Sequence, residues 1–330
     1  MSFEMNIIWA SVLLVAGLVM LWKSADILVD GAIGLAKRLG ISALVVGLTV
    51  VAMGTSAPEV AASIAAVLQK GGGDIAIGNV FGSNIANLAL VGGLAALIRP
   101  IHVRKKILQR EMPAMLLVAL LLWPLLGNLS LSRPEGVLLL AVFSALIFVT
   151  VYMAQKESKN KAETIPQTSG ETRKSRSAKP FKANILFIVI GLVGLAVGAK
   201  MVVTGAVFVG RKVGMSDSVI GLTIIAFSTS LPELVTCVVA AVKGHHDISI
   251  GNLVGSNIFN TLLVTGAASM VRPFEVAKRF AGGADYWIMI IVSGGFFLMA
   301  LAGRRISRAN GIALFCGYVA YIVYLLAFSA

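Results

Sequence analysis

The sequence predicts an all-α integral membrane protein with ten transmembrane helices, built as two inverted five-helix repeats with discontinuous central helices. Three observations predict this class. The 330 residues are 58% hydrophobic and 13% charged, with a mean hydropathy of +0.91, which is far more apolar than soluble domains. Ten apolar runs are long enough for a hydrocarbon core, which takes about 20 helical residues. The second half of the chain also repeats the first.

The first apolar run lacks a convincing small-residue cleavage site, so we interpret it as a retained helix and not as a removed signal peptide. Cys237 and Cys316 fall inside runs, where a lone cysteine acts as a small apolar residue, so no disulfide is predicted. The ten runs in chain order are 6–22, 41–69, 75–98, 107–127, 134–154, 183–210, 216–242, 248–271, 284–303 and 308–328.

A polar, basic segment with Pro and Ser, 155–182, separates a first half (1–154) from a second half (183–330) and reads as a linker. It could alternatively bind a lipid headgroup or a regulator. Most of the 28 Lys and Arg lie in this linker and in the loops on its side. By the positive-inside rule that side is cytoplasmic, so both termini lie outside a multi-pass protein of the cell inner (plasma) membrane. The net charge of +13 therefore indicates membrane lipids and no nucleic acid as a partner.

The two halves are copies at a nearly fixed offset, and even the terminators match, Arg99-Pro100 with Arg272-Pro273. Five spans in each copy is an odd number, so the second copy crosses the membrane in the opposite sense, as in alternating-access transporters. The matching segments are "ADILVDGAIGLAKRLG" (25–40) with 199–214, "VVGLTVVAMGTSAPEV" (45–60) with 219–234, and "DIAIGNVFGSNIANLALVGG" (74–93) with 247–266.

Each copy has a proline in mid-span, in "GTSAPE" (54–59) and "STSLPE" (228–233). Pro58 and Pro232 have no N–H, so we expect the carbonyls of Gly54 and Ser228 to lose their helical partners. Irregular backbone at this depth is tolerated only inside protein or beside a watery cavity. The side chains that flank the breaks all supply oxygen, namely Thr55, Ser56 and Glu59 in the first copy and Thr229, Ser230 and Glu233 in the second.

Of the fifteen Asp and Glu, only Glu59 and Glu233 sit deep in a span beside a break. An ionisable residue inside the membrane is expected to be functional, because its isolated burial costs several kcal/mol. The alternative is a structural Glu that is neutral or paired with Lys, but no cation occupies these motifs. Asp26 and Asp30 fall at i+3 and i+7 from Lys23, so a helix-end ion pair is predicted for them.

The next helix of each copy carries a polar stripe at i, i+4 and i+8. We interpret the first member of each stripe, Asn79 and Asn252, as interhelical hydrogen bonding. The deeper members are expected to line a pore or bind a ligand, although interhelical bonding remains the alternative for them too. They are Ser83, Asn87, Ser256 and Asn260.

The three histidines, His102, His245 and His246, lie in loops, and the spans contain no His or Cys cluster for zinc or copper. Ligation by oxygen alone suits hard cations, and two Glu would cancel the charge of one divalent ion. No cofactor is indicated. A membrane hydrolase would need a base beside Ser56 or Ser230, and none is present, so we predict that the protein is not an enzyme.

"GTSAPE…GNVFGSN" and "STSLPE…GNLVGSN" resemble the paired repeats of the cation/calcium exchanger superfamily, specifically its prokaryotic sodium/calcium exchanger (antiporter) branch. The resemblance implies that the first and sixth of ten helices slide past a central site, and that sodium entry drives calcium exit by alternating access. It implies a site for calcium and sodium made of Glu59, Glu233, Thr55, Ser56, Thr229, Ser230, Ser83, Ser256, Asn87, Asn260 and the carbonyls of Ala52 and Ala226.

The sequence departs from some relatives, including potassium-dependent ones, which carry Asp where this chain has Asn260. The segment 155–182 is also too short for the regulatory domain of animal relatives. A proton/calcium antiporter and a cation channel are the alternative functions. Neutral oxygens around each Glu favour sodium, because a proton needs no coordination shell. The sequence does not indicate an oligomeric state.

Overall fold

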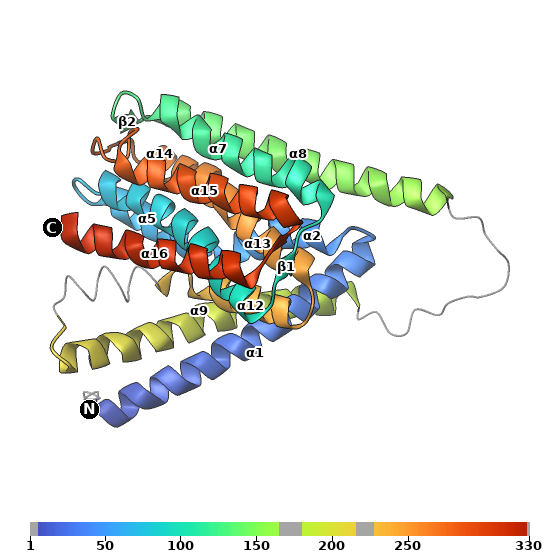
Figure 1. The fold of residues 1–330 in the computed structure, drawn as a ribbon, viewed down its shortest axis with the longest axis horizontal. Helices are drawn as coiled ribbons and strands as arrows, with labels where there is room; N and C mark the ends of the chain where they lie inside the picture. Colours follow the sequence, from blue (N-terminus) through green and yellow to red (C-terminus); the bar gives the residue numbers. More distant parts are fainter. Residues whose placement is uncertain (1–5, 165–179, 216–227, 329–330) are drawn as a thin grey trace.

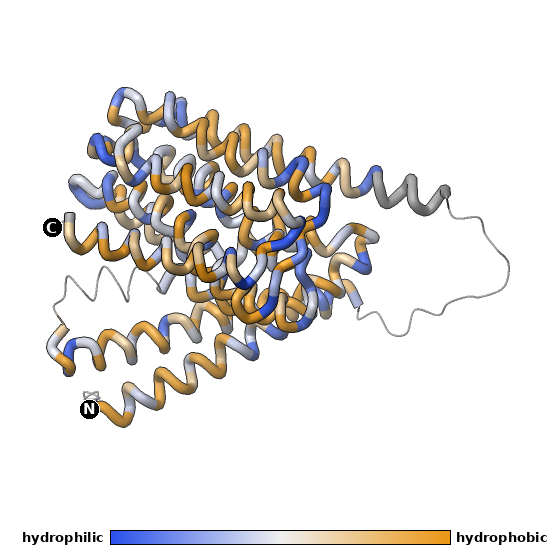
Figure 2. Tube along the Cα trace, viewed as in Figure 1, coloured by the Kyte–Doolittle hydropathy of each residue, from blue (hydrophilic) through white to orange (hydrophobic). Residues whose placement is uncertain are grey.

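The protein is described here from a computed structural model that covers residues 6–164, 180–215 and 228–328. Most of these residues are helical, and Figure 1 shows the helices lying beside one another along the long axis of the molecule. In this part of the chain eight helices are long and apolar enough to cross a membrane, and nine if one bent pair counts as a single span. Apolar residues cover the helices and hydrophilic residues gather at the ends and loops (Figure 2). The chain is an all-α, multi-pass membrane protein.

The first half begins with one long helix and continues through several helices that are interrupted by π-helical turns, labelled η. Its elements are α1 (Ile7–Leu39), α2 (Ala43–Val46), η1 (Gly47–Val51), α3 (Ala52–Thr55), α4 (Ala57–Leu68), α5 (Gly73–Ile85), η2 (Ala86–Val91), α6 (Gly92–Ile98), β1 (Ile101–His102), η3 (Ile107–Glu111), α7 (Met112–Leu125), β2 (Ser130–Leu131) and α8 (Arg133–Thr164).

The second half follows the same order of elements where the structure describes it. Its elements are α9 (Phe181–Lys212), α12 (Leu231–Val242), α13 (His246–Phe259), η5 (Asn260–Val264), α14 (Thr265–Val271), β3 (Phe274–Glu275), α15 (Ala284–Gly303), β4 (Arg305–Ile306) and α16 (Arg308–Phe328). The start of the predicted run 216–242 lies outside the described residues, and α12 covers its end.

Two predicted boundaries are wrong. The helix predicted over 6–22 continues to Leu39, because small and apolar residues such as Leu28 and Ala32 keep one face buried although charged residues interrupt the hydropathy on the other. Gly40, with φ 65°, then ends it. The span predicted over 134–154 also ends too early, since α8 runs on to Thr164 through a stretch that contains neither Gly nor Pro.

The centre of the molecule consists of the two spans that carry the polar stripes. About 78% of the apolar window in Gly73–Ile98 and 72% of that in His246–Val271 is buried, against 11% in α8 and in α16. α13 also lies very close to the first broken helix: a Cβ added at Gly255 would stand 2.6 Å from the carbonyl oxygen of Leu48. Glycine therefore allows this contact.

α1 and α9 pack along each other at the side of this centre. Gly17 of α1 lies against Gly198 of α9, and Gly31 lies against Asn184, so the two helices run antiparallel. A Cβ added at Gly191 would stand 2.7 Å from the Cβ of Leu28, which means that only glycine permits this separation. The two long helices form one closely packed pair.

Two short antiparallel ribbons join the halves. β1 pairs with β4, with Ile101 opposite Ile306, and β2 pairs with β3, with Leu131 opposite Phe274. Each ribbon thus takes one strand from each half, and Figure 1 shows β1 and β2 toward opposite ends of the bundle. The same figure places the two chain termini at one end of the molecule.

Candidate ion-binding site

The first helix break and the backbone before α12 have nearly the same geometry. The first span bends by 42° between Thr55 and Ala57, where Ser56 has φ −84° and ψ 6°. Ser230, which precedes α12, has φ −86° and ψ 1°. A twelve-residue helix follows each break, α4 or α12, with proline near its first position and a Glu in its first turn. A proline there is tolerated because the first N–H groups of a helix have no partner within it.

The carboxylates that follow these breaks are buried and lie near each other. Glu59 is 0% exposed and Glu233 is 1% exposed. The Ser56 hydroxyl donates a hydrogen bond to Glu233 Oε1 at 3.2 Å, so the first break contacts the Glu of the second half. Ser83 of α5 is a polar neighbour of Glu59. Residues from both halves therefore meet at one point inside the molecule.

The Ser56 hydroxyl lies three residues before Glu59, but it does not bond to that Glu. Its hydrogen bond goes to the other half instead. The Thr55 hydroxyl lies within 3.3 Å of three acceptors, the carbonyls of Val51 and Ala52 and the Oδ1 atom of Asn252. Since a hydroxyl has one proton, two of these oxygens are left for another donor or for a cation.

Many buried polar side-chain atoms of the two break motifs and of the stripe helices have no hydrogen-bond partner among the described residues. Native proteins pair nearly all such groups, because each unpaired one costs about 1–3 kcal/mol. Carboxylate, hydroxyl and amide oxygens are the ligands that a hard cation takes. The atoms include both carboxylate oxygens of Glu59, Glu233 Oε2, the hydroxyls of Ser230 and Ser256, and the side-chain amide groups of Asn87 and Asn260.

Asn87 and Asn260 stand at equivalent π-helical turns, Asn87 within η2 and Asn260 at the first residue of η5. Both side chains are 0% exposed. A π-helical turn displaces the residues that follow it and is common at functional sites. These turns are not predicted by the sequence, because the residues there are apolar or small apart from the Asn itself and do not differ in type from those of an α-helix.

Asn79 and Asn252 bond across helices, as the sequence predicts. Asn79 Nδ2 donates to Ser63 Oγ at 2.9 Å and to the Glu59 carbonyl at 3.2 Å, so it fixes the first turn of α4. Asn252 Nδ2 donates to Cys237 Sγ at 3.4 Å. Both therefore hold a stripe helix against a Glu-bearing helix.

The remaining predicted ligands are placed less completely. The Ala52 carbonyl accepts the amide of Ser56 at 3.0 Å and keeps a second lone pair. Thr229 is half-buried next to Ser230. Ala226 lies outside the described residues. Among the residues described, no group of three or more His, Cys, Asp or Glu is arranged to hold a metal ion, so oxygens of neutral groups must complete any shell around the two Glu.

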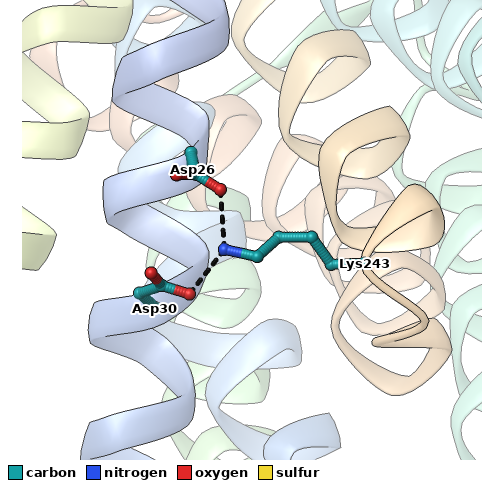
Figure 3. A network of polar contacts seen from close by, with 3 residues as sticks. All are labelled: Asp26, Asp30 and Lys243. Carbon is teal, nitrogen blue, oxygen red and sulfur yellow. Dashed lines mark hydrogen bonds and ion pairs between the residues drawn. The ribbon is translucent and has the colours of Figure 1, made fainter.

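Asp26 and Asp30 form an ion pair, but the cation is not Lys23. Lys243, just after α12, places its Nζ atom 2.6 Å from a carboxylate oxygen of each Asp (Figure 3). The prediction of a helix-end pair within α1 was wrong because sequence spacing reports only neighbours on the same helix. The observed pair joins α1 to the loop between α12 and α13.

A second buried polar group, next to the candidate site, was not predicted. Asn84 Nδ2 donates to Thr261 Oγ1 at 2.9 Å, and Thr261 donates to the Asn257 carbonyl at 2.8 Å. Asn84 and Asn257 occupy equivalent positions of the two copies, in the "GSN" triplets. The duplicated triplet was the available signal, and these residues join α5 to α13 and η5.

The chain is similar to known proteins over most of its length. Residues 9–152 and 183–327 match the family described as "Sodium/calcium exchanger protein". CaxA of Alkalimonas amylolytica, which carries the name of an antiporter, is 39% identical over 94% of this chain and 97% of its own length. The sodium/calcium exchanger MaX1 of Methanosarcina acetivorans is 35% identical over 95% of this chain and 97% of its own length.

The fold resembles a solved exchanger equally well. The structure of the sodium-calcium exchanger NCX_Mj without Na⁺ and Ca²⁺ superposes with a TM-score of 0.81 and 30% identity, covering 97% of this chain and 100% of that one. A structure of the sodium/calcium exchanger from Methanococcus jannaschii gives a TM-score of 0.80 at 29% identity, covering 96% and 99% of the two chains.

Proposed function

The chain belongs to the sodium/calcium exchanger protein family, and from this premise we propose that it exchanges sodium for calcium across the membrane. Proteins of this family are exchangers and not enzymes. The observation that carries the proposal is that Glu59 and Glu233 are buried with unpaired carboxylate oxygens, while hydroxyl and amide oxygens of the break motifs and stripe helices are buried and unpaired as well. Two carboxylates balance one calcium ion, and neutral oxygens complete a shell for either cation.

In this proposal calcium is bound jointly by the two Glu, and sodium by Glu together with the hydroxyls, amides and carbonyls nearby. The bond from Ser56 to Glu233 and the position of Ser83 beside Glu59 support a single shared site between the halves. No cofactor is required. The proposed ligands are Glu59, Glu233, Thr55, Ser56, Thr229, Ser230, Ser83, Ser256, Asn87, Asn260 and the carbonyls of Ala52 and Ala226.

The proposal includes ten transmembrane helices in two inverted repeats, 1–154 and 183–330, with the linker 155–182 between them. The matching breaks, the matching π-helical turns at Asn87 and Asn260, and the antiparallel α1 and α9 support this arrangement. Inverted repeats give one site two related ways to open, so transport proceeds by alternating access.

The proposed orientation of the chain in the membrane follows from the charge of its loops. The basic loops face the cytoplasm by the positive-inside rule, both termini lie outside, and the membrane is the inner (plasma) membrane of the cell. The start of α1 and the end of α16 lie at one end of the bundle, which supports placing them on the same side of the membrane (Figure 1). An inward sodium gradient then drives calcium out.

The experiment that tests the proposal is calcium uptake into proteoliposomes that contain the purified protein. Uptake should follow an outward sodium gradient, and it should not follow an outward proton gradient applied at the same membrane potential. Uptake driven by protons alone would replace the proposal with proton/calcium exchange. Calcium conductance without any countertransported ion would indicate a channel. Glu275→Gln serves as a matched control for carboxylate loss, because Glu275 is exposed at β3.

A further inference from the structure

α4 and α12, the two helices whose first turns carry Glu59 and Glu233, each meet an arginine at the opposite end. Arg272 Nη1 donates a hydrogen bond to the carbonyl of Leu68, the last residue of α4, at 3.2 Å. Arg99 Nη1 donates to the carbonyl of Val242, the last residue of α12, at 2.7 Å. The last carbonyls of a helix lack partners within it and carry its negative dipole end, so a guanidinium is a favourable partner there.

Each arginine also ends a helix that carries one of the buried Asn. Arg99 follows α6, which continues from η2 and Asn87, and Arg272 follows α14, which continues from η5 and Asn260. Their backbones are alike and extended, with φ −146° and ψ 121° at Arg99 and φ −149° and ψ 123° at Arg272. The proline after each arginine explains this, because the residue before proline is forced out of the α-region.

The two contacts connect opposite halves of the chain. α6 packs against α12, and α14 packs against α4. Arg99 therefore links the Asn87 helix of the first half to the Glu233 helix of the second, and Arg272 links the Asn260 helix to the Glu59 helix. A twelve-residue helix is about 18 Å long and stiff. Fixing its last turn therefore fixes the position of its first turn along the helix axis.

We propose that Arg99 and Arg272 are positioning residues for the ion site. They set where Glu233 and Glu59 lie along their helix axes relative to Asn87 and Asn260. This inference rests on the proposed function, because it assigns the four side chains to one ion site. The arginines do not touch the ion. Each holds one Glu-bearing helix at its far end, and the "Arg-Pro" pair at each position builds the contact into the sequence.

The test compares Arg99→Gln and Arg272→Gln with the wild type in proteoliposome transport. The KM for calcium should rise about fivefold in each variant while kcat changes less, because loss of one charge-assisted hydrogen bond displaces a ligand without removing it. Arg99→Lys and Arg272→Lys keep the charge at the helix end and should recover part of the KM. An unchanged KM in both Gln variants would overturn the inference.

Arg308→Gln is the matched control. Arg308 Nε donates to the carbonyl of Leu97, near the end of α6, at 3.1 Å, so it also binds a helix C-terminus but not that of a Glu-bearing helix. Because Arg308 contacts the Asn87 helix alone and does not join it to α12, its loss should raise the KM for calcium less than the loss of Arg99 does. A rise in KM equal to that of Arg99→Gln would show that charge at this face, and not the contact with α12, sets the affinity.

A second readout separates the inference from the function on which it rests. Hydrogen exchange of the peptide 231–242 should become faster in Arg99→Gln at both ends of α12, including the turn that holds Glu233. Faster exchange at the Val242 end alone would mean that the arginine only caps the helix, and this would overturn the inference. Absence of calcium transport by the wild type would refute the proposed function, whereas the exchange measurement would still report on the arginine contacts.

Discussion

The two halves of the molecule agree closely around the centre and differ at its edge. Ser63 in the first half and Cys237 in the second are equivalent. Each accepts a hydrogen bond from the first Asn of a stripe, Asn79 at 2.9 Å and Asn252 at 3.4 Å. Each also donates to a carbonyl of the stripe helix, that of Ala76 at 3.3 Å or of Ser249 at 3.5 Å. The atoms changed from oxygen to sulfur while the contacts stayed, which shows that the arrangement of the helices is what both halves retain.

The ion pair of Asp26 and Asp30 with Lys243 has no such counterpart. The equivalent positions of α9 hold Lys200 and Thr204, and neither is acidic. α1 is therefore tied to the α12–α13 loop by a contact that α9 cannot repeat on the other half. The residues at the centre are therefore equivalent in the two halves. The contacts that hold the long helices differ, because α1 has an ion pair with the other half that α9 lacks.

Removing one of the two equivalent carboxylates should have the largest effect on transport. Glu59→Gln or Glu233→Gln leaves a divalent ion half-balanced in a site from which water is excluded. Either variant should lower calcium transport by at least about 100-fold, since loss of one buried charge partner costs about 3–5 kcal/mol. Radioactive calcium uptake measures this, with Glu275→Gln as the control. Wild-type uptake by either variant would remove that Glu from the site.

A smaller change compares the two π-helical turns. Asn87→Ala and Asn260→Ala each remove a neutral oxygen, so calcium transport should fall about tenfold in both, less than for either Glu. Similar losses in the two variants would show that the two equivalent Asn residues contribute equally to transport. A loss at one position only would show that the ion lies nearer to that half.

The sequence allowed the breaks, the buried Glu and the polar stripes to be predicted, because proline, charge and helical spacing act within one segment. Contacts between the halves could not be predicted in the same way. The bond from Ser56 to Glu233 and the pairing of Lys243 with α1 depend on how distant helices meet. The π-helical turn at Asn260 was missed because an extra residue in one turn changes the backbone and not the residue types.

The unmatched ion pair can be tested by Lys243→Gln. Burial alone would lower the pKa of Lys243, but the hydrogen bonds and charges of Asp26 and Asp30 raise it above 10.5 overall. The pair therefore stabilises the fold below the ordinary lysine pKa, and this stability is lost as the pH rises through the raised value. Partly exposed pairs contribute about 0.5–1 kcal/mol.

Thermal unfolding in detergent at pH 8 should show Lys243→Gln melting about 1–2 °C below the wild type. The gap should close at pH values above the raised pKa. A gap that persists there would assign the loss to packing of the lysine stem and not to its charge.

His245 gives the smallest expected effect, at the same edge of the molecule. Burial and the neighbouring cation of Lys243 lower the pKa of His245 below 6.5, while Asp30 and Asp247 act in the opposite direction. The folded protein then binds fewer protons than the unfolded chain, so stability falls as the pH drops through 6.5.

His245→Asn should remove a few tenths of a kcal/mol of this acid sensitivity, seen as a smaller change in melting temperature between pH 7.5 and pH 5.5. The double variant with Lys243→Gln should show how much of it comes from the lysine charge. An acid sensitivity equal to that of the wild type would contradict the assignment to His245.

The ribbons have a consequence for how the polypeptide could be divided. β1 pairs with β4 and β2 pairs with β3, so each ribbon contains one strand from each half. α1 of the first half also packs against α9 of the second half. The peptide bonds of 155–182 are thus not what holds the halves together. Two separately expressed chains, severed in that segment, should assemble into the same particle, as a heterodimer of related subunits. The same interlocking would serve two identical copies inserted in opposite directions, which is the ancestor that a fused, duplicated gene implies.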